Sequence, residues 1–382
     1  MAKGRILIVG GGIAGLSAAW SLVTRGYAVE LFEQGPLPNP VGSSYDEHRI
    51  IRHAYGTLGG YAAMMPAAFA RWEALWTYLG TRHYDPCGTV YMFYDEVPDW
   101  AAASTASLDA LGFAHEDLTP HQIERCLPMV AQEGLVAGYR AEGSGMLFPA
   151  RILLDLVVKL AASGVVLNAN ARVEAIDPER ARVTVAGRDI AGDRLVVAAG
   201  AWVNRLLALP PAEIRPSRQG AVYLAPPPDL AAAWAEAPVL IDMRPAGGCY
   251  TLPPRRHTRL KIADDLYTYR GDPDDGRAGT DLDMARLLDA AARAYARFGD
   301  YTILERKACY YSVTADTRFI SRPIGGAGWL VSACSGHGFK FGPLMGEGAA
   351  AAITGERAAA AVTAWAAGQG DPALVSPPVR VD

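Results

Sequence analysis

The chain has 382 residues, of which 51% are hydrophobic, so it is long enough to bury one large core or two linked cores. Its formal charge of −4 provides no long-range field that would attract nucleic acid or an anionic membrane. The first apolar run is soon broken by glycines and lacks the small-residue cleavage site of a secretion signal. We therefore expect a cytoplasmic globular protein.

Two residue types are scarce enough to be informative. The five cysteines are widely spaced, with no C-x-x-C pair and no histidine at metal-ligand spacing, so neither a disulfide framework nor a metal site is predicted. For each cysteine alone, a small buried hydrophobic side chain is the simplest interpretation. Only five of the 36 basic residues are lysines, so each lysine hints that a compact, titratable ammonium was needed.

The N-terminal segment predicts a βαβ unit. Residues 5–9 ("RILIV") are a short β-branched run that ends in the glycine-rich "GGGIAG". A helical pattern follows as far as Gly26, which is a natural helix stop, and residues 27–33 ("YAVELFE") predict the second strand.

The glycines of this unit indicate a dinucleotide site. Gly10, Gly12 and Gly15 fit G-x-G-x-x-G, in which they allow a tight turn, close approach of a pyrophosphate and helix–strand packing. The helix N-terminus would face the phosphates, and Glu33, at the end of the second strand, would accept hydrogen bonds from the adenosine ribose. An acid at this position disfavours NADP, but the fingerprint alone does not separate NAD from FAD.

The remaining elements alternate between two groups. Helices are predicted at residues 61–80, 99–112, 149–164 and 283–298, and strands at 89–94, 165–168, 171–176, 181–185, 194–202, 219–225, 249–253 and 259–263. The last part, residues 328–353, is a strand, a glycine-rich loop and a small-residue helix.

This order predicts a dinucleotide domain made of three separated segments, with a second domain inserted twice. The dinucleotide domain takes residues 1–84, 146–215 and 306–382, and the second domain takes 85–145 and 216–305. The junction between them is a usual place for a ligand.

Five stretches in order carry a family resemblance: "VGGGIAGLSAAWSL", "HRIIRHAYG", "VVAAGAW", "KACYYSV" and "SGHGFKFGPLMGE". Together they resemble the FAD-dependent amine oxidases of the monomeric sarcosine oxidase and N-methyltryptophan oxidase family, within the D-amino acid oxidase superfamily. The resemblance implies an α/β fold: a Rossmann-like FAD-binding domain with an inserted, β-rich α+β substrate domain. Further cofactor contacts are implied at Ile13, Ala14, Val173, Gly336, Gly338 and Phe339.

Cys309 lies two residues after Lys307 and two before Tyr311, which is where the family attaches the flavin 8α-methyl group to a cysteine. The resemblance therefore implies covalent FAD at Cys309 and a substrate contact at Tyr311. A thiolate that adds to the flavin needs a lowered pKa or a nearby cation, and the thioether would raise the flavin's potential. The competing interpretation is that Cys309 only packs in a strand.

Arg49 and Arg52 are three residues apart, so one helical turn could aim both side chains at the same cleft. The resemblance places Arg49 against the flavin, as a catalytic and cofactor-binding residue. It implies that Arg52 and Lys340 hold a substrate carboxylate, with Lys340 also near the cofactor. The simpler interpretations are a solvated helix face and an ordinary loop lysine.

Tyr250 and Lys261 are eleven residues apart, the family spacing between a pocket tyrosine and the lysine that activates oxygen. An ammonium above the flavin would stabilise the anionic state through which O2 is reduced. A strand lysine exposed to solvent is the competing interpretation.

Three positions depart from the sarcosine-oxidising members. Tyr45 and Asp265 stand where those proteins have histidine, and His48 where they usually have threonine. Tyr45 and Asp265 are thus expected to contact a different substrate. Asp265 could pair with a substrate ammonium, or form a salt bridge with Lys261 that would slow oxygen use and favour a dehydrogenase.

The resulting hypothesis is a monomeric flavoenzyme that oxidises a secondary amine or amino acid carrying a carboxylate, N-methylated or cyclic, to an imine, with O2 reduced to H2O2. A flavin monooxygenase is the rival, but its "GD" motif should lead into a late helix, and "RGDPDDG" at residues 270–276 lacks that context. Two more hypotheses stay open: a dehydrogenase that uses another electron acceptor, and a catalytically silent flavin-binding protein.

Overall fold

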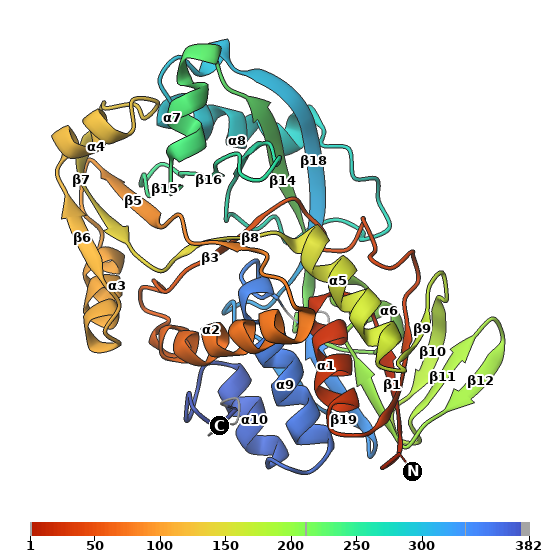
Figure 1. The fold of residues 1–382 in the computed structure, drawn as a ribbon. Coiled ribbons are helices and arrows are strands. Elements are labelled where there is room, and N and C mark those ends of the chain that lie inside the picture. Colours follow the sequence, from red (N-terminus) through yellow and green to blue (C-terminus); the bar gives the residue numbers. More distant parts are fainter. Residues whose placement is uncertain (1, 211, 333, 376–382) are drawn as a thin grey trace.

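A six-stranded sheet carries the glycine-rich segment in the computed structural model, which describes residues 2–210, 212–332 and 334–375 (Figure 1). Its order is β19-β20-β13-β1-β2-β9, and all pairs are parallel except β19 with β20. The strands are β1 (Arg5–Val9), β2 (Ala28–Phe32), β9 (Val166–Asn168), β13 (Arg194–Val197), β19 (Ile320–Ile324) and β20 (Gly328–Ser332).

The two faces of this sheet are covered differently. Ile6 and Ile8 of β1 pack in a core with the helices, whereas Leu7 and Val9 pack on the other face in a core with a three-stranded antiparallel sheet. The helices are α1 (Ile13–Val23), α2 (Gly59–Leu79), α5 (Pro149–Ala162), α9 (Gly342–Ile353) and α10 (Ala359–Ala366). The small sheet consists of β10 (Val173–Asp177), β11 (Arg182–Val185) and β12 (Arg188–Ala191). Because both faces are covered, β1 is a continuous apolar run.

A second, eight-stranded sheet forms the upper lobe in Figure 1. Its order is β18-β14-β17-β16-β15-β5-β7-β6. The strands are β5 (Thr89–Tyr94), β6 (His115–Leu118), β7 (Leu135–Ala141), β14 (Arg215–Ala225), β15 (Val239–Asp242), β16 (Tyr250–Leu252), β17 (Leu260–Ala263) and β18 (Thr302–Val313).

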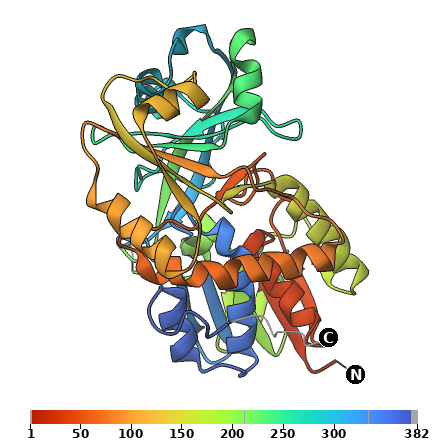
Figure 2. The same cartoon turned by 60° about the vertical axis from the view of Figure 1, so that its left-hand side comes forward.

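Helices cover both faces of the eight-stranded sheet. Trp234 of α7 (Ala231–Glu236), Ile123 of α4 (Pro120–Cys126) and Met284 of α8 (Asp281–Ala294) share one core with alternate residues of β5 and β14. The opposite residues of β5 pack with α3 (Asp99–Ala110). In both ribbon views α2 runs along the side of the lower lobe that faces this sheet (Figure 2).

A short sheet of order β3-β8-β4 lies between the two large sheets (Figure 1). It consists of β3 (Arg49–Ile51), β4 (Tyr84–Asp85) and β8 (Gly145–Leu147). The prediction that one helical turn carries Arg49 and Arg52 is therefore wrong. Ile50 and Ile51 are β-branched, and β3 pairs antiparallel with β8, so the tertiary partner selects the extended form.

The predicted α/β fold, with a βαβ unit at the N-terminus and a second β-rich part, is confirmed. The four expected domain boundaries all fall inside strands, namely β4, β8, β14 and β18. The division of the chain at those residues stays a prediction.

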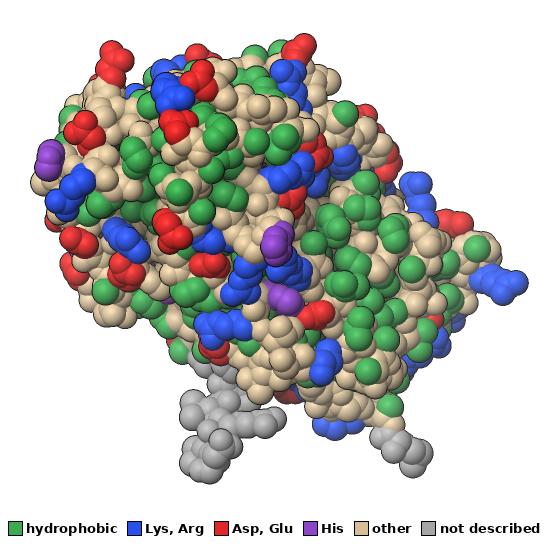
Figure 3. All heavy atoms as spheres, turned by 45° about the horizontal axis from the view of Figure 1, so that its top comes forward, with side chains coloured by type: hydrophobic (Ala, Val, Ile, Leu, Met, Phe, Trp, Pro, Cys, Tyr) green, Lys and Arg blue, Asp and Glu red, His purple; other side chains and the backbone are tan. Residues whose placement is uncertain are grey.

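Surface charge and helix length bear on whether the protein could bind nucleic acid or a membrane. Charged side chains of both signs are scattered over the face in Figure 3. Within the described ranges, every helix is too short or too polar to cross a membrane.

Gly15 offers a test of how the first helix packs on the first strand. A Cβ added there would lie 1.9 Å from the Gly10 carbonyl oxygen, so we expect Gly15→Ala to lower the free energy of unfolding by about 1–3 kcal/mol. Gly59→Ala is the matched control, because a Cβ at this helical glycine meets nothing within 4 Å. Urea unfolding of both variants measures the difference, and equal stability of the two would contradict the close packing.

Candidate active site

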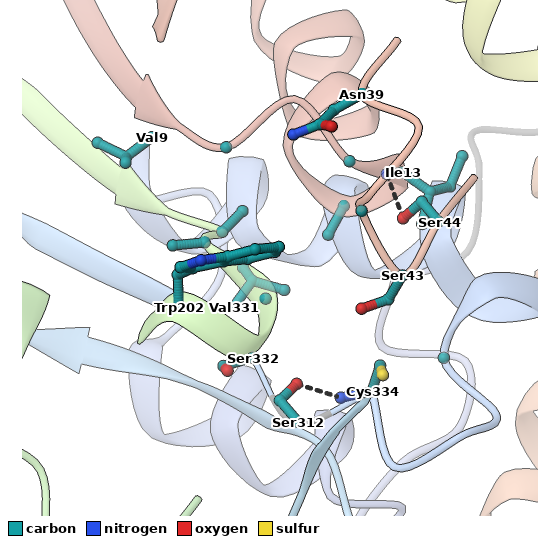
Figure 4. A pocket seen from close by; sticks show the side chains of 18 of the residues that line it. Val9, Ile13, Asn39, Ser43, Ser44, Trp202, Ser312, Val331, Ser332 and Cys334 are labelled. Carbon is teal, nitrogen blue, oxygen red and sulfur yellow. Dashed lines mark hydrogen bonds between the residues drawn. The ribbon is translucent and has the colours of Figure 1, made fainter. Parts of the chain in front are cut away.

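The turn between β1 and α1 opens into a cavity of about 480 Å³ (Figure 4). The predicted cofactor residues that line it are Gly10, Gly12, Ile13, Ala14, Glu33, Arg49, Val173, Gly336, Gly338 and Phe339. Gly15 lies behind the turn, where it lets α1 pack on the Gly10 backbone. The structure thus brings together residues from β1, β2, β3, β10 and the loop before α9.

The backbone of the turn requires glycine. Gly10 has φ +107°, and a Cβ there would lie 2.3 Å from the Ala198 carbonyl oxygen. At Gly12 a Cβ would point toward Ser44 Oγ, 3.0 Å away. The Ile13 N–H, in the first turn of α1, donates to Ser44 Oγ at 3.0 Å (Figure 4). This cradle of close backbone and N–H groups at a helix N-terminus suits a pyrophosphate.

Glu33 lies at the end of β2, where the ribose contact is predicted. Its carboxylate accepts hydrogen bonds from the Gly11 N–H at 2.7 Å, the Gly35 N–H at 3.1 Å and the Asn39 amide at 2.8 Å. These bonds hold the side chain against the glycine turn and at the cavity wall. Sequence reasoning missed Asn39, which lies in the loop after the βαβ unit.

A second cavity of about 530 Å³ shares part of its wall with the first. Arg49, Tyr311, Gly336 and Phe339 line both cavities. The predicted substrate and catalytic residues that line the second cavity are Arg49, Arg52, Tyr250, Lys261, Asp265, Tyr311 and Lys340. Tyr45 lines neither cavity; its ring lies 6.0 Å from Lys307 Nζ.

Two cations in the second cavity have no acidic partner within the described ranges. The Arg52 guanidinium donates to the Ala54 carbonyl and lies 4.9 Å from the Tyr55 ring centroid. Lys340 Nζ lies 5.5 Å from the same centroid and 3.4 Å from the His337 carbonyl oxygen, with the side chain only 5% exposed. Burial and the nearby Arg52 charge hold the Lys340 pKa well below its usual value. When both side chains are protonated, such a pair can bind an anion.

Lys261 and Arg49 converge on Asp46, a residue that sequence reasoning missed. Lys261 Nζ lies 2.6 Å from Asp46 Oδ2, and the Arg49 guanidinium and the Tyr223 hydroxyl donate to the same carboxylate. Burial raises the pKa of Asp46, but the Arg49 and Lys261 charges outweigh it and hold the pKa well below its usual range. Burial and Arg49 lower the Lys261 pKa to about 8, although Asp46 raises it.

Lys261 therefore has a carboxylate partner, but it is Asp46 and not Asp265. Asp265 lies at the second cavity, exposed, and forms no ion pair with Lys261. The local sequence offered one signal for the ion pair of Asp46 with Arg49, namely their separation by three residues. The pairing with Lys261 spans 215 residues and is not readable from the chain.

Cys309 lies in β18, opposite Gln219 of β14, and is absent from the lining of both cavities. Burial raises the pKa of its thiol, against the lowering effect of Arg49 and Lys261. A nearby cation is thus present, as flavin attachment requires, but the thiol pKa is not lowered. Tyr311, two residues further on the same strand, lines both cavities.

His48 is fully buried beside this cluster. Its Nε2 lies 2.9 Å from the Arg259 carbonyl oxygen, so the Nε2–H tautomer is the one that donates there. Burial and the Lys261 charge lower the His48 pKa to about 4. The imidazole is therefore neutral at physiological pH. Within the described ranges no group of three His, Cys, Asp or Glu side chains could hold a metal ion.

A Rossmann-type sheet whose nucleotide cavity adjoins a second, cation-lined cavity is typical of dinucleotide-dependent enzymes. Residues 5–352 match the family described as FAD dependent oxidoreductase (DAO). The chain belongs to this family, and FAD is the cofactor that the family binds. The glycine cradle and Glu33 fit the pyrophosphate and ribose of that cofactor.

Individual relatives cover almost the whole chain. N-methyl-L-tryptophan oxidase of Yersinia pestis (strain Pestoides F) is 25% identical over 358 residues, which is 90% of this chain and 93% of that protein. The solved structure of L-proline dehydrogenase from P. horikoshii has a TM-score of 0.81 at 20% identity and covers 97% of both chains. That of NikD, an amino acid oxidase essential for nikkomycin biosynthesis, has a TM-score of 0.80 at 20% identity and covers 99% of this chain and 98% of NikD. The two structures show the fold.

Proposed function

We propose that the protein oxidises a secondary amine or amino acid that carries a carboxylate, N-methylated or cyclic, to the imine. The observation that carries this proposal is a pair of cations, buried Lys340 and half-buried Arg52, in the cavity that adjoins the FAD cavity. Two basic side chains that have no acidic partner in the described part of the chain favour the binding of an anion in this cavity. A substrate carboxylate supplies it, and the relative in Yersinia pestis is named for an amino acid of this kind.

The two cations have different roles. Arg52 offers a planar fork of N–H donors, and Lys340 offers a compact ammonium, so together they would fix a carboxylate in both position and orientation. Anchoring one end of the substrate presents its amine-bearing carbon to the wall that both cavities share. When bound, FAD would supply the redox chemistry: it would take a hydride equivalent from that carbon, the amine N–H would lose the second proton, and the two electrons and two protons would pass to an acceptor.

We infer O2 as the acceptor, with H2O2 as the product, because Lys261 and Arg49 place positive charge on the cavity wall. A dehydrogenase is the second candidate, since Asp46 takes up part of that charge. Oxygen consumption and dye reduction by the same substrate-reduced enzyme separate the two. The cytoplasmic location and the monomeric state stay predictions.

Carboxylate-bearing amines should bleach the flavin of the purified holoenzyme under anaerobic conditions. We expect bleaching with N-methyl amino acids, proline or pipecolate, and none with the matching amines that lack the carboxylate, because only the former engage Arg52 and Lys340. Stopped-flow absorbance measures the reduction. Bleaching only by primary D-amino acids would overturn the substrate class, and no bleaching by any amine would favour a silent flavin-binding protein. Consumption of NAD(P)H would indicate a monooxygenase.

Lys340→Met should weaken binding of acetate, an unreactive carboxylate, by about 10- to 100-fold, because a charge-assisted hydrogen bond is lost. In the unmodified protein, binding should weaken as the pH rises through the lowered Lys340 pKa, where the ammonium loses its proton, while Arg52 keeps its charge. Titration followed by the flavin spectrum measures both effects. Lys159→Met, on the exposed face of α5, is the control. Equal acetate affinity in the two variants would exclude Lys340 from the anion site.

Acid denaturation tests whether Cys309 holds the flavin. The yellow colour should stay with the polypeptide, and should pass wholly into the supernatant in Cys309→Ala, because the thioether is missing. Cys334→Ala is the control, since Cys334 lines the FAD cavity. Release from the unmodified protein would mean that Cys309 only packs in β18, and release in Cys334→Ala alone would move the attachment to Cys334.

A further inference from the structure

Asp46 is the point where three structural elements of the site meet. It lies in the loop before β3 and receives donors from Arg49 of β3, Tyr223 of β14 and Lys261 of β17. The Asp46 side chain is 5% exposed and that of Lys261 is 1% exposed. Asp46 itself lines neither cavity, whereas Lys261 lines the second cavity and Arg49 lines both.

The charges of this cluster do not cancel. One carboxylate lies between two cations, buried Lys261 and half-buried Arg49, so the cluster keeps net positive charge, and that charge faces the cavity through both. A buried ammonium without a counter-charge is costly and loses its proton readily. The carboxylate that compensates this cost for Lys261 is Asp46.

Other ionisable groups around Lys261 cannot replace Asp46. Those that act on this cluster are Asp46, Glu47, His48, Arg49, Tyr223, Lys307 and Cys309. Burial leaves His48 neutral and raises the pKa of Tyr223 and Cys309, so these three are uncharged near neutral pH. Arg49 and Lys307 are cations. Glu47 forms its ion pair with Arg259, so Asp46 is the anion of this set that contacts Lys261.

We propose that Asp46 is a positioning residue, which holds the Lys261 ammonium in place at the cavity wall and keeps it protonated at neutral pH. The inference deepens the proposed function and rests on it in one respect, namely that Lys261 serves as the cation for the electron acceptor. The contact at 2.6 Å between Lys261 Nζ and Asp46 Oδ2 carries it.

The scarcity of lysine allows a direct test on the holoprotein, independent of turnover. Labelling with [ε-13C]lysine gives five side-chain signals, and Lys261→Met identifies the signal of Lys261 by its loss. In the unmodified protein this signal should titrate near pH 8. In Asp46→Asn it should titrate at least about one pH unit lower, because the compensating charge is gone.

Two further variants complete the titration. Asp265→Asn is the matched control, since Asp265 lines the same cavity without contacting Lys261. This variant should change the midpoint of the Lys261 titration by no more than roughly a few tenths of a pH unit. If Asp46→Asn does not fold, Asp46→Ser removes the same charge from a smaller side chain. An unchanged Lys261 midpoint in the charge-removing variant, or an equal shift in Asp265→Asn, would overturn the proposal.

The functional consequence can be measured without any amine. Photochemically reduced holoenzyme is mixed with O2, and the rate of flavin reoxidation is followed against pH. In the unmodified protein the rate should fall as the pH rises through about 8. In Asp46→Asn the same fall should occur at a pH at least about one unit lower. In a Lys261→Met background, Asp46→Asn should have no further effect on this profile.

The outcomes separate the two proposals. A reoxidation profile that does not move, although the Lys261 signal does, would overturn the link between Asp46 and the acceptor. Failure of every amine to reduce the enzyme would overturn the proposed substrate class, and neither measurement on Asp46 depends on it.

Discussion

The site depends on one carboxylate that partly compensates two cations, Arg49 and Lys261. Arg49 comes from the short sheet between the two large sheets and Lys261 from the eight-stranded sheet, and both are held by the single carboxylate of Asp46. Without that carboxylate, buried Lys261 would face the Arg49 charge with no counter-charge, which a folded protein tolerates poorly. The ion cluster therefore both ties the lobes together and sets the charge of the cavity wall.

The two cavities differ in what they recognise, and their shared wall explains how they act together. The first cavity is lined by glycine turns, where a ligand can approach the backbone closely, and it suits a dinucleotide. The second carries Arg52 and Lys340, cations that a ligand must balance. Arg49, Tyr311, Gly336 and Phe339 line both cavities, so the two cavities adjoin at these residues.

Several site residues were predictable because their signals are local or because they belong to short motifs. The positive φ of Gly10 and the place of Glu33 at the end of β2 follow from the βαβ pattern. The structure also brings Arg52 and Lys340, predicted from separate motifs, into one cavity. The helical turn expected at Arg49 was wrong, since pairing with β8 selected a strand, and Asp46 was missed because its partner lies 215 residues away.

The sequence by itself determined the class of fold, the dinucleotide turn and the family, because these depend on spacing along the chain: strand, glycines, helix, strand and acid in order. Only the tertiary structure decided which charges meet. Whether Lys261 faces Asp46 or Asp265, and whether Cys309 reaches a cavity, depends on strand pairing between distant segments. Electrostatic effects in a buried site depend on distances of a few ångströms and on exclusion of water, and neither is encoded locally.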